Sequence, residues 1–209
     1  MDQVDVFVLL DDVQYKKNEW QNRNKIRNAE SWQWITVPVI YEFGQLIKDI
    51  KIDNHGSWRS KHLKSIELNY SHAPFLEEHL PCFKETLSKE WELLADINIE
   101  FIHRIKEALG ISTELCVSSS MNIQTASTER LVDICKGLKA DTYLAGAGGA
   151  EYMDVDLFKK NGIGLEFQNY THPKYPQAYK GFQPNMAVID LLFCRGKESL
   201  DIIREGRGK

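Results

Sequence analysis

Carboxylates, amides, cations and an indole are concentrated in residues 11–25, near the start of the sequence. Asp11 and Asp12 come directly after the apolar, β-branched run Val4–Leu10, which is typical of a short buried strand. Ligands of open α/β sheets bind at the carboxyl ends of the strands, so this segment is well placed to hold one. Asp11 or Asp12 could orient or deprotonate an amine or hydroxyl, and Arg23 could bind a phosphate or carboxylate bidentately.

The same segment contains further candidates for ligand binding. They are amide, cationic and aromatic side chains, which supply planar donors and stacking surfaces: Gln14, Lys16, Trp20, Asn22 and Asn24. The alternative interpretation is a solvated loop, because loops are polar whether or not they bind anything. Trp20 counts against that alternative, since an exposed indole is costly in a loop without a function.

A second candidate site follows the buried run Asp141–Ala145, which predicts another strand. Gly146, Gly148 and Gly149 would let backbone N–H groups approach an anion, and Tyr152 lies just beyond them. The motif is weak, because it contains neither G-x-G-x-x-G nor G-K-[ST]. A tight strand-to-helix turn that needs left-handed backbone angles explains the glycines equally well.

A third candidate lies in the long irregular segment 168–185. Segments of this length without regular structure are often lids or binding loops. His172 could act as an acid or base, and Tyr175 and Gln177 could donate hydrogen bonds to a ligand. The alternative is a surface loop that Pro173 and Pro176 merely stiffen.

Other polar residues give weaker signals. Trp58, Lys61 and His62 share one face of a predicted helix, where a histidine is more often a packed residue than a ligand. The serines at 118–120 follow a short strand and could serve either turn chemistry or ligand contact. No cluster has the spacing of zinc ligands, and Asp11 with Asp12 alone does not predict a metal site, so no metal and no particular cofactor is predicted.

Composition excludes several classes of function. The 209-residue chain has a formal net charge of −4 at pH 7, whereas general nucleic-acid binders usually carry a basic excess. Its four widely spaced cysteines predict reduced thiols in a cytosolic protein. No apolar run is long enough to cross a bilayer, and Asp2 and Asp5 replace the basic start of a signal peptide. We therefore expect a cytoplasmic protein of unknown oligomeric state, and the polar segments at the strand ends predict a small-molecule substrate for it.

The patterns predict an α/β fold with a mostly parallel sheet, flanking helices in a Rossmann-like arrangement, and a central helical insertion at about 57–110. Strands are expected at 4–10, 32–39, 47–52, 115–117, 141–145 and 163–167. Helices are expected from Trp58 with Ser57 as cap, after Pro74, at 91–109, from 127 or 128, after Asp154 or Asp156, and at 186–193. The tail from Ile202 is expected to fray. The length is compatible with a single domain, residues 1–209.

Several of these segments together resemble the WbqC-like protein family. The resemblance rests on Asp5–Tyr15, on Trp20–Ile26 with its W-x-N-R-N sequence, on Trp34–Val39, on Tyr143–Tyr152 and on Pro184–Phe193. It covers nearly the whole chain. Family members usually have an additional first strand and a Gln-Pro-x-x-x-Pro-x-x-Gly-like segment ahead of the Asp5 strand, which this sequence does not contain. Either the sequence is truncated ahead of Met1, or this member has lost one wall of its site.

The resemblance implies a cytoplasmic role in bacterial surface-polysaccharide biosynthesis of the O-antigen type. One activity that it suggests is glycyl or other acyl transfer to a nucleotide-linked amino sugar. The alternative is a sugar-nucleotide binding or scaffolding protein of the same pathway that performs no catalysis. Both hypotheses place the polar segment around Arg23 in one site with the glycines around Gly148.

Overall fold

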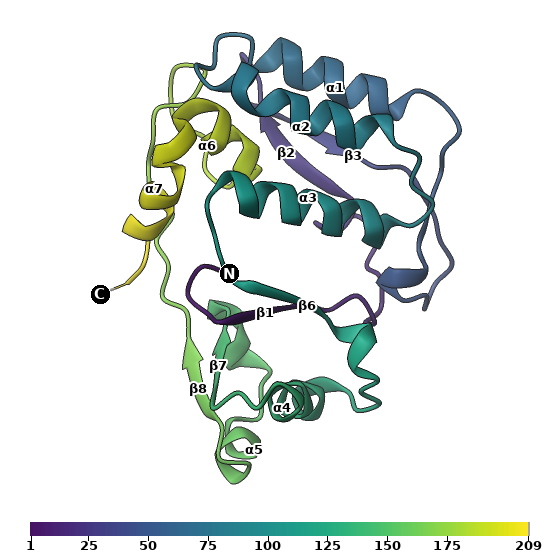
Figure 1. Cartoon of the computed structure of the whole chain (residues 1–209), viewed down its shortest axis with the longest axis vertical. Helices are drawn as coiled ribbons and strands as arrows, with labels where there is room; N and C mark the ends of the chain where they lie inside the picture. The colour runs from purple at the N-terminus through teal and green to yellow at the C-terminus, as the bar shows by residue number, and fades with distance from the viewer. Residues whose placement is uncertain (209) are drawn as a thin grey trace. The chain divides into compact units, whose positions relative to one another are not determined.

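The structure of the chain is a computed structural model that describes residues 1–208 (Figure 1). The chain forms two compact units. Unit 1 consists of Met1–Asp11, Thr113–Thr171 and the residues from Gly206 onward, and unit 2 consists of Asp12–Ser112 and His172–Glu205. We describe each unit by itself.

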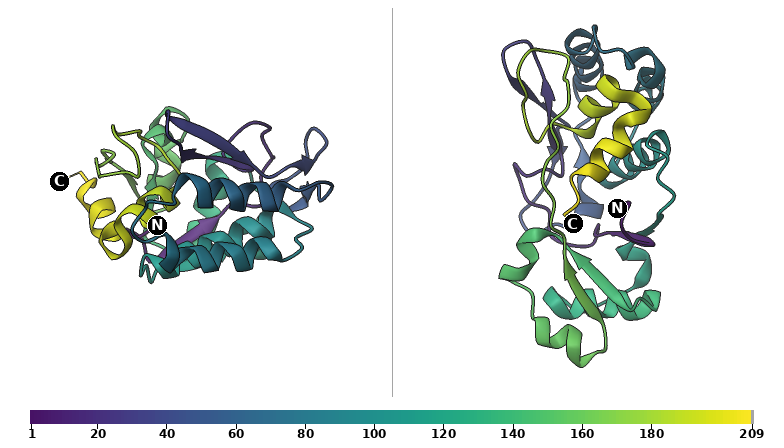
Figure 2. Two further views of the ribbon diagram at one scale, coloured as in Figure 1. Left: turned by 90° about the horizontal axis from the view of Figure 1, so that it is seen from above. Right: turned by 90° about the vertical axis from the view of Figure 1, so that its left-hand side faces the viewer.

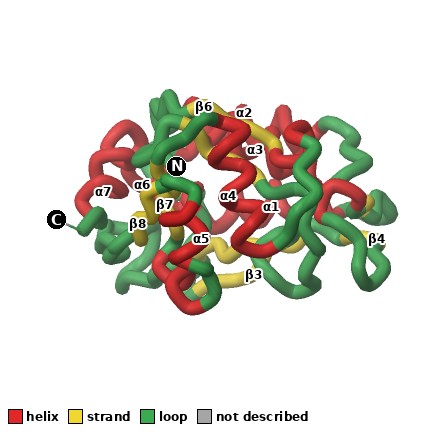
Figure 3. The backbone as a smooth tube through the Cα atoms, turned by 90° about the horizontal axis from the view of Figure 1, so that it is seen from below, coloured by secondary structure: helices red, strands yellow, loops and turns green. Residues whose placement is uncertain are grey.

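Unit 1 is an α/β unit with two pairs of parallel strands. Strand β1 (Val6–Leu9) pairs with β6 (Glu114–Val117), and β7 (Thr142–Ala145) pairs with β8 (Gly164–Phe167). Helices α4 (Ser127–Leu138) and α5 (Val155–Lys160) connect the later strands (Figure 3). A small core of Val132, Cys135, Phe158 and Ile163 joins the two helices to β7 and β8.

Unit 2 contains a β-hairpin and a layer of helices. Strands β2 (Arg23–Arg27) and β3 (Trp32–Thr36) are antiparallel, as are the short strands β4 (Val39–Ile40) and β5 (Lys51–Ile52). Helices α1 (Trp58–Asn69), α2 (Leu76–Ser88) and α3 (Leu94–Ala108) lie side by side, with the hairpin β2–β3 along one side of them (Figures 1 and 2). Helices α6 (Val188–Arg195) and α7 (Ser199–Glu205) complete the unit.

The hairpin is attached to the helices through its apolar side chains. Ile26 is fully buried in a core with Ile66 of α1, Phe83 of α2 and Phe193 of α6, and Ile35 packs against this core. Burying a side chain of this size stabilises the fold by about 1.5–3 kcal/mol, so the hairpin is held by one of its two faces.

A buried polar network lies beside this core. The Asp190 carboxylate accepts hydrogen bonds from the hydroxyls of Tyr70 and Tyr175 and from Nε2 of Gln177, at 2.9–3.0 Å. Oε1 of Gln177 accepts from Nε of Arg27, whose guanidinium also donates to the backbone carbonyls of Lys180 and Gly181 in the irregular segment. These bonds tie the long irregular segment to the hairpin and to α6.

The fold class is confirmed at the level of a mixed α/β structure, and its finer description is not. In the described part of the chain the strands form four two-stranded sheets, two parallel and two antiparallel, so a Rossmann-like sheet is not confirmed. The helices predicted between residues 57 and 110 are present as α1, α2 and α3.

The structure differs from five local expectations. Residues 23–27 form strand β2 and not a loop, and Ile47–Asp49 form a 3-10 helix ahead of the short strand β5. The Ser57 side chain makes no capping hydrogen bond to α1, although the helix begins where it was expected. The tail is helical through Glu205. Gly146 has φ −64° and no positive φ is found at Gly148 or Gly149, so the glycine turn needs no left-handed residue.

Candidate functional site

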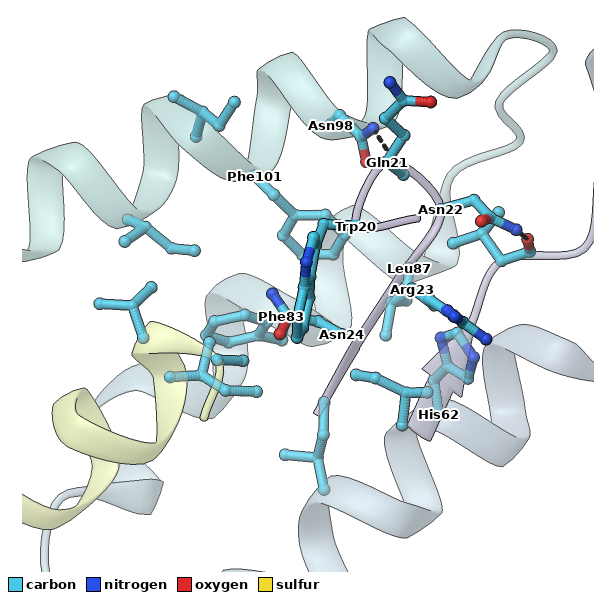
Figure 4. A pocket seen from close by; sticks show the side chains of 18 of the residues that line it. Trp20, Gln21, Asn22, Arg23, Asn24, His62, Phe83, Leu87, Asn98 and Phe101 are labelled. Atoms are coloured by element: carbon cyan, nitrogen blue, oxygen red, sulfur yellow. Dashed lines mark hydrogen bonds between the residues drawn. The ribbon is translucent and has the colours of Figure 1, made fainter. Parts of the chain in front are cut away.

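A cavity of about 370 Å³ opens in unit 2 between the hairpin β2–β3 and the helices (Figure 4). Its walls are mostly apolar and come from β3, α1, α2, α3 and the start of α6; among them are Ile35, Ile66, Phe83, Leu87, Phe101 and Ile102. The segment Trp20–Asn24 forms another wall, with His62 and Asn98 as further polar residues. A mostly apolar cavity with a few polar groups is the usual form of a small-molecule site.

Some of the polar atoms around the cavity have no hydrogen-bond partner among the described residues. They are Oδ1 of Asn22, Nε of Arg23 and Nε1 of Trp58, and all three are buried. Trp58 as a whole is 6% exposed. Leaving a buried polar atom unpaired costs about 1–3 kcal/mol, so these atoms favour a site that a polar ligand completes.

One hydrogen bond defines the tautomer of His62, a titratable residue of the cavity. Its Nε2 lies 3.0 Å from the carbonyl oxygen of Thr36, which can only accept, so Nε2 carries the hydrogen and Nδ1 keeps its lone pair. Burial lowers the pKa of His62, although the bond to Thr36 acts in the other direction. The ring is therefore neutral at pH 7 and suited to accept a proton at Nδ1.

The outer face of the hairpin carries a cluster that we call the tryptophan face: Trp20, Trp32, Trp34, Arg23 and Lys25. The Trp34 ring centre lies 5.3 Å from that of Trp20 and 5.5 Å from that of Trp32. Nζ of Lys25 is 4.2 Å from the centre of Trp32, and Cζ of Arg23 is 4.2 Å from the centre of Trp34. These cation–π contacts hold two positive charges among three indoles.

The β2–β3 register explains this arrangement. Lys25 is paired with Trp34 and Arg27 with Trp32, and alternate residues of a strand share a face. Trp20 and Arg23 also line the cavity, so the tryptophan face and the cavity are adjacent surfaces of one site. Trp20 is 55% exposed, which leaves its indole accessible to a ligand.

The other candidates in residues 11–25 have different surroundings. Asn22 donates to the carbonyl oxygen of Val37. Both Asn22 and Asn24 line the cavity. Gln14 and Lys16 are exposed on the segment ahead of the hairpin, and Asp12 is half-buried there. Their ligand-binding or catalytic roles stay predictions.

Asp11 belongs to unit 1 and is buried. Its carboxylate accepts hydrogen bonds from the backbone N–H and the hydroxyl of Ser119, at 2.9 and 2.7 Å, and from the hydroxyl of Ser118 at 3.2 Å. These bonds hold the end of β1 against the start of the 3-10 turn Ser118–Met121. The serines thus act in turn chemistry around Asp11, whose catalytic role stays a prediction.

The glycine turn is also part of unit 1. Gly146 and Gly148 are exposed, and a side chain added to either would meet no atom within 4 Å, so a ligand could approach the backbone there. Gly149 is buried against Ala145 and Met153, which gives it a packing role. Tyr152 is 73% exposed. Because Arg23 and the glycines belong to different units, their predicted common site stays a prediction.

The three candidates of the long irregular segment take part in the architecture of unit 2. Tyr175 is buried and donates to Asp190, and Gln177 bridges Asp190 and Arg27. His172 is half-buried, with Nδ1 2.8 Å from the carbonyl oxygen of Pro173 and Nε2 accepting from the N–H of Asn185 at 3.3 Å. Their proposed contacts with a substrate stay predictions.

Sequence reasoning missed the roles of His62 and Trp34 in this site. His62 was assigned to packing, although its helical spacing from Trp58 was recognised. The signal for Trp34 was its alternation with Trp32, which places both indoles on one face of a strand.

Among the described residues no group of three or more metal-ligating side chains is found, and no helix has the length and apolar character needed to cross a membrane. All four cysteines are unpaired thiols. These findings do not identify a ligand for the site.

Comparison with known proteins gives two matches. The family model described as "WbqC-like protein family" matches residues 1–202. The uncharacterized protein Rv1507c of Mycobacterium tuberculosis is 34% identical over 205 residues, which cover 96% of this chain and 88% of that protein. No solved structure matches the chain.

Proposed function

Because the chain belongs to the WbqC-like protein family, which suggests a polysaccharide-related function, we propose that it acts in bacterial surface-polysaccharide assembly as an acyltransferase. The acceptor would be the amino group of a nucleotide-linked sugar. The observation that carries this proposal is the adjacency of an apolar cavity, a neutral imidazole and a face of indoles and cations in unit 2.

Each surface suits one part of such a reaction. The cavity would bind the acyl group of the donor, because its walls are hydrocarbon and aromatic. The tryptophan face would bind the sugar nucleotide, since indoles stack on bases and on the apolar C–H face of a sugar ring. Arg23 and Lys25 would contact the diphosphate there.

His62 would provide the proton transfer. An amine attacks an acyl carbonyl only after it has lost its ammonium proton, and Nδ1 of His62 could accept the proton that the attacking amine releases. With a thioester donor, the amide C–N bond forms as the C–S bond breaks, and the leaving thiolate takes up the proton that His62 accepted. Correct placement of the two substrates would supply much of the rate.

The two binding surfaces can be tested separately by thermal unfolding with an acyl thioester or a nucleotide-linked amino sugar. A ligand at one hundred times its Kd stabilises a folded protein by about 2.7 kcal/mol, which raises the Tm by roughly 5–10 °C in a chain of this size. Ile102→Phe should fill the cavity and abolish the shift caused by the thioester alone. Trp34→Ala should abolish the shift caused by the sugar nucleotide alone.

Two exposed residues provide matched controls. Ile40→Phe repeats the first change at a side chain that is 58% exposed, and Phe43→Ala removes an aromatic ring that is 96% exposed. Neither control should alter the ligand shifts. If Ile102→Phe and Ile40→Phe respond identically to the thioester, the cavity is not the acyl site.

A second function is supported by the exposure of Trp20 and by the cations already positioned over the indoles. Such a surface could bind a sugar nucleotide without changing it, as a binding or scaffolding protein would. Incubation with both ligands followed by mass spectrometry of the sugar separates the two. Addition of the acyl mass supports the transferase, whereas binding without any product supports the scaffold.

A further inference from the structure

The cavity of unit 2 extends along two of its helices. Trp58, His62 and Ile66 of α1 all line it, and residues four apart share one face of a helix. With a rise of 1.5 Å per residue, this wall is about 12 Å long. The lining residues of α3 run from Asn98 to Ile105, which is about 10 Å. Walls of this length suit an extended chain.

One end of the cavity is polar. His62 is bonded to the carbonyl oxygen of Thr36, and Thr36 is paired with Arg23 across the hairpin. The ring of His62 lies 5.2 Å from that of Trp58. Nε of Arg23 and Nε1 of Trp58 are donors from which no described residue accepts a hydrogen bond. This end therefore suits a carbonyl oxygen of the ligand, which accepts hydrogen bonds.

The opposite end is apolar. The lining residues there belong to one hydrophobic core of unit 2 or pack against it: Ile66, Phe83, Ile105, Ala187 and Ile189. In Figure 4 this end lies beside α6, drawn in yellow, and away from Arg23 and His62. A ligand that fills the whole cavity must therefore have a polar head and an apolar tail.

The charges of the walls limit what the tail can carry. Among the described residues that line the cavity there is no aspartate or glutamate, whereas Arg23 brings a positive charge. A glycyl group carries an ammonium when its amine is protonated, and an ammonium buried without a partner is costly. The cavity therefore favours an uncharged acyl group over an aminoacyl group.

We propose that the cavity binds a straight, uncharged acyl chain of about ten carbon atoms, with its carbonyl group at the polar end, and that Ala187 and Ile105 limit the length of the chain. An apolar cavity of about 150 Å³ holds a benzene ring, so about 370 Å³ has room for roughly ten carbons and their carbonyl group. This inference rests on the proposed function and names the acyl group of that reaction, which excludes glycyl.

Ala187 and Ile105 are suited to limit the length for different reasons. Ala187 has the smallest side chain of the cavity wall, so a larger one would occupy space that the ligand uses. Its backbone N–H donates to the carbonyl oxygen of Lys25 at 2.8 Å, which holds it against the hairpin. Ile105 is only partly buried, so its truncation would enlarge the apolar end.

Isothermal titration calorimetry with straight-chain acyl pantetheine thioesters, from acetyl to tetradecanoyl, tests the native protein first. Each added CH₂ group should lower the Kd about fourfold while it is being buried. The gain should stop at about ten carbon atoms, where the chain reaches the end of the cavity. Glycyl pantetheine should bind no more tightly than acetyl pantetheine.

Two substitutions should move this limit in opposite directions. Ala187→Leu should shorten the longest chain that still gains affinity by about three carbon atoms, and Ile105→Ala should lengthen it by about three. Ala108→Leu, at an exposed residue of α3, and Ile40→Ala, at a side chain that is 58% exposed, are the matched controls and should leave the limit unchanged. If one variant does not fold, the other still tests the limit.

The inference and the proposed function can fail separately. A limit that is the same in Ala187→Leu and Ile105→Ala, or tighter binding of glycyl than of octanoyl pantetheine, would overturn the inference even if the protein transfers acyl groups. Length-limited binding without transfer to a sugar would support the inference and contradict the transferase. Absence of binding by every thioester would overturn both.

Discussion

The hydroxyl of Tyr70 donates a hydrogen bond to Oδ2 of Asp190 at 3.0 Å, and both residues are fully buried. The same hydroxyl accepts from the backbone N–H of Arg27 at 3.0 Å. One phenol thus connects α1, α6 and the hairpin strand β2. The hairpin carries the tryptophan face, so this connection helps to fix the position of the candidate site relative to α1 and α6.

Tyr70→Phe should therefore destabilise the protein, because it leaves the Arg27 N–H and one Asp190 oxygen without their partner. We expect a loss of about 1–3 kcal/mol in the free energy of unfolding, measured by urea denaturation. Tyr152→Phe is the matched control, since its ring is 73% exposed and surface changes stay within about 0.5 kcal/mol. Equal effects of the two substitutions would contradict a structural role for the Tyr70 hydroxyl.

The pH dependence of stability should report on Asp190. Burial raises the pKa of its carboxyl group, and the hydrogen bonds from Tyr175, Tyr70 and Gln177 oppose this only in part. The folded state therefore holds the proton more tightly than the unfolded state, whose carboxyl has a pKa of about 3.9. Stability from this group is greatest below the unfolded pKa and decreases as the pH rises through the folded pKa.

Asp190→Asn removes that titration. The variant should gain stability relative to the native protein as the pH rises from about 4 toward neutrality, measured by denaturation at a series of pH values. A difference in stability that is constant over this range would show that the Asp190 pKa is not raised in the folded state.

Gly196 offers a test of steric fit between α6 and the start of α2. It has φ +50°, and an added Cβ would lie 2.5 Å from Cδ1 of Phe75. Gly196→Ala should cost the strain of a positive φ, about 1–3 kcal/mol, and a further amount for displacing the ring. Gly44→Ala is the control, because Gly44 has φ +93° with no atom within 4 Å of the added Cβ. The difference in the free energy of unfolding isolates the clash.

A substitution of Asp11 tests whether its carboxylate has a structural or a catalytic role. Asp11→Ala removes the acceptor of three hydrogen bonds from Ser118 and Ser119, so we expect a loss of about 1–3 kcal/mol in the free energy of unfolding. Asp156→Ala, at an exposed residue in the first turn of α5, should change it little. Unchanged stability of Asp11→Ala, together with lost turnover, would support a catalytic role for Asp11.

The sequence predicted the elements whose apolar pattern is regular. Strand β1, the three helices α1–α3 and the strand–helix–strand series from β6 to β8 all have clear periodicity or flanking turn residues. Asp154 or Asp156 was predicted as a helix cap, and Asp154 accepts from the N–H of Leu157. Such signals are local, so a single sequence contains them.

The tryptophan face was less predictable because its cause is not local. Arg23–Arg27 alternates cations with an amide and one isoleucine, a composition that is depleted in strands. The segment becomes a strand because it pairs with Trp32–Thr36 and because its cations lie on the indoles across the hairpin. Asn22, Arg23 and Asn24 were predicted to bind a ligand, and they line the cavity, but the helices that complete its walls come from later parts of the chain.

The sheet could not be predicted as a whole from this sequence. Each parallel pair of unit 1 was predicted as a set of strands, yet the two pairs are joined by no strand of the described chain. The Rossmann-like arrangement of these strands therefore stays a prediction.

His62 allows the proposed chemistry to be tested by pH. Burial lowers the pKa of His62 below the ordinary value of about 6.5, so the rate of acyl transfer should fall on the acid side with a midpoint below that value.

His62→Gln keeps an N–H donor for the carbonyl oxygen of Thr36 but has no basic nitrogen. It should lower kcat by about 10²–10⁴-fold, abolish the acid limb and leave the Tm shifts with both ligands in place. His103→Gln, at an exposed position on α3, is the control. Loss of the ligand shifts in His62→Gln would assign the residue to positioning of the hairpin, because a proton acceptor is not needed for binding.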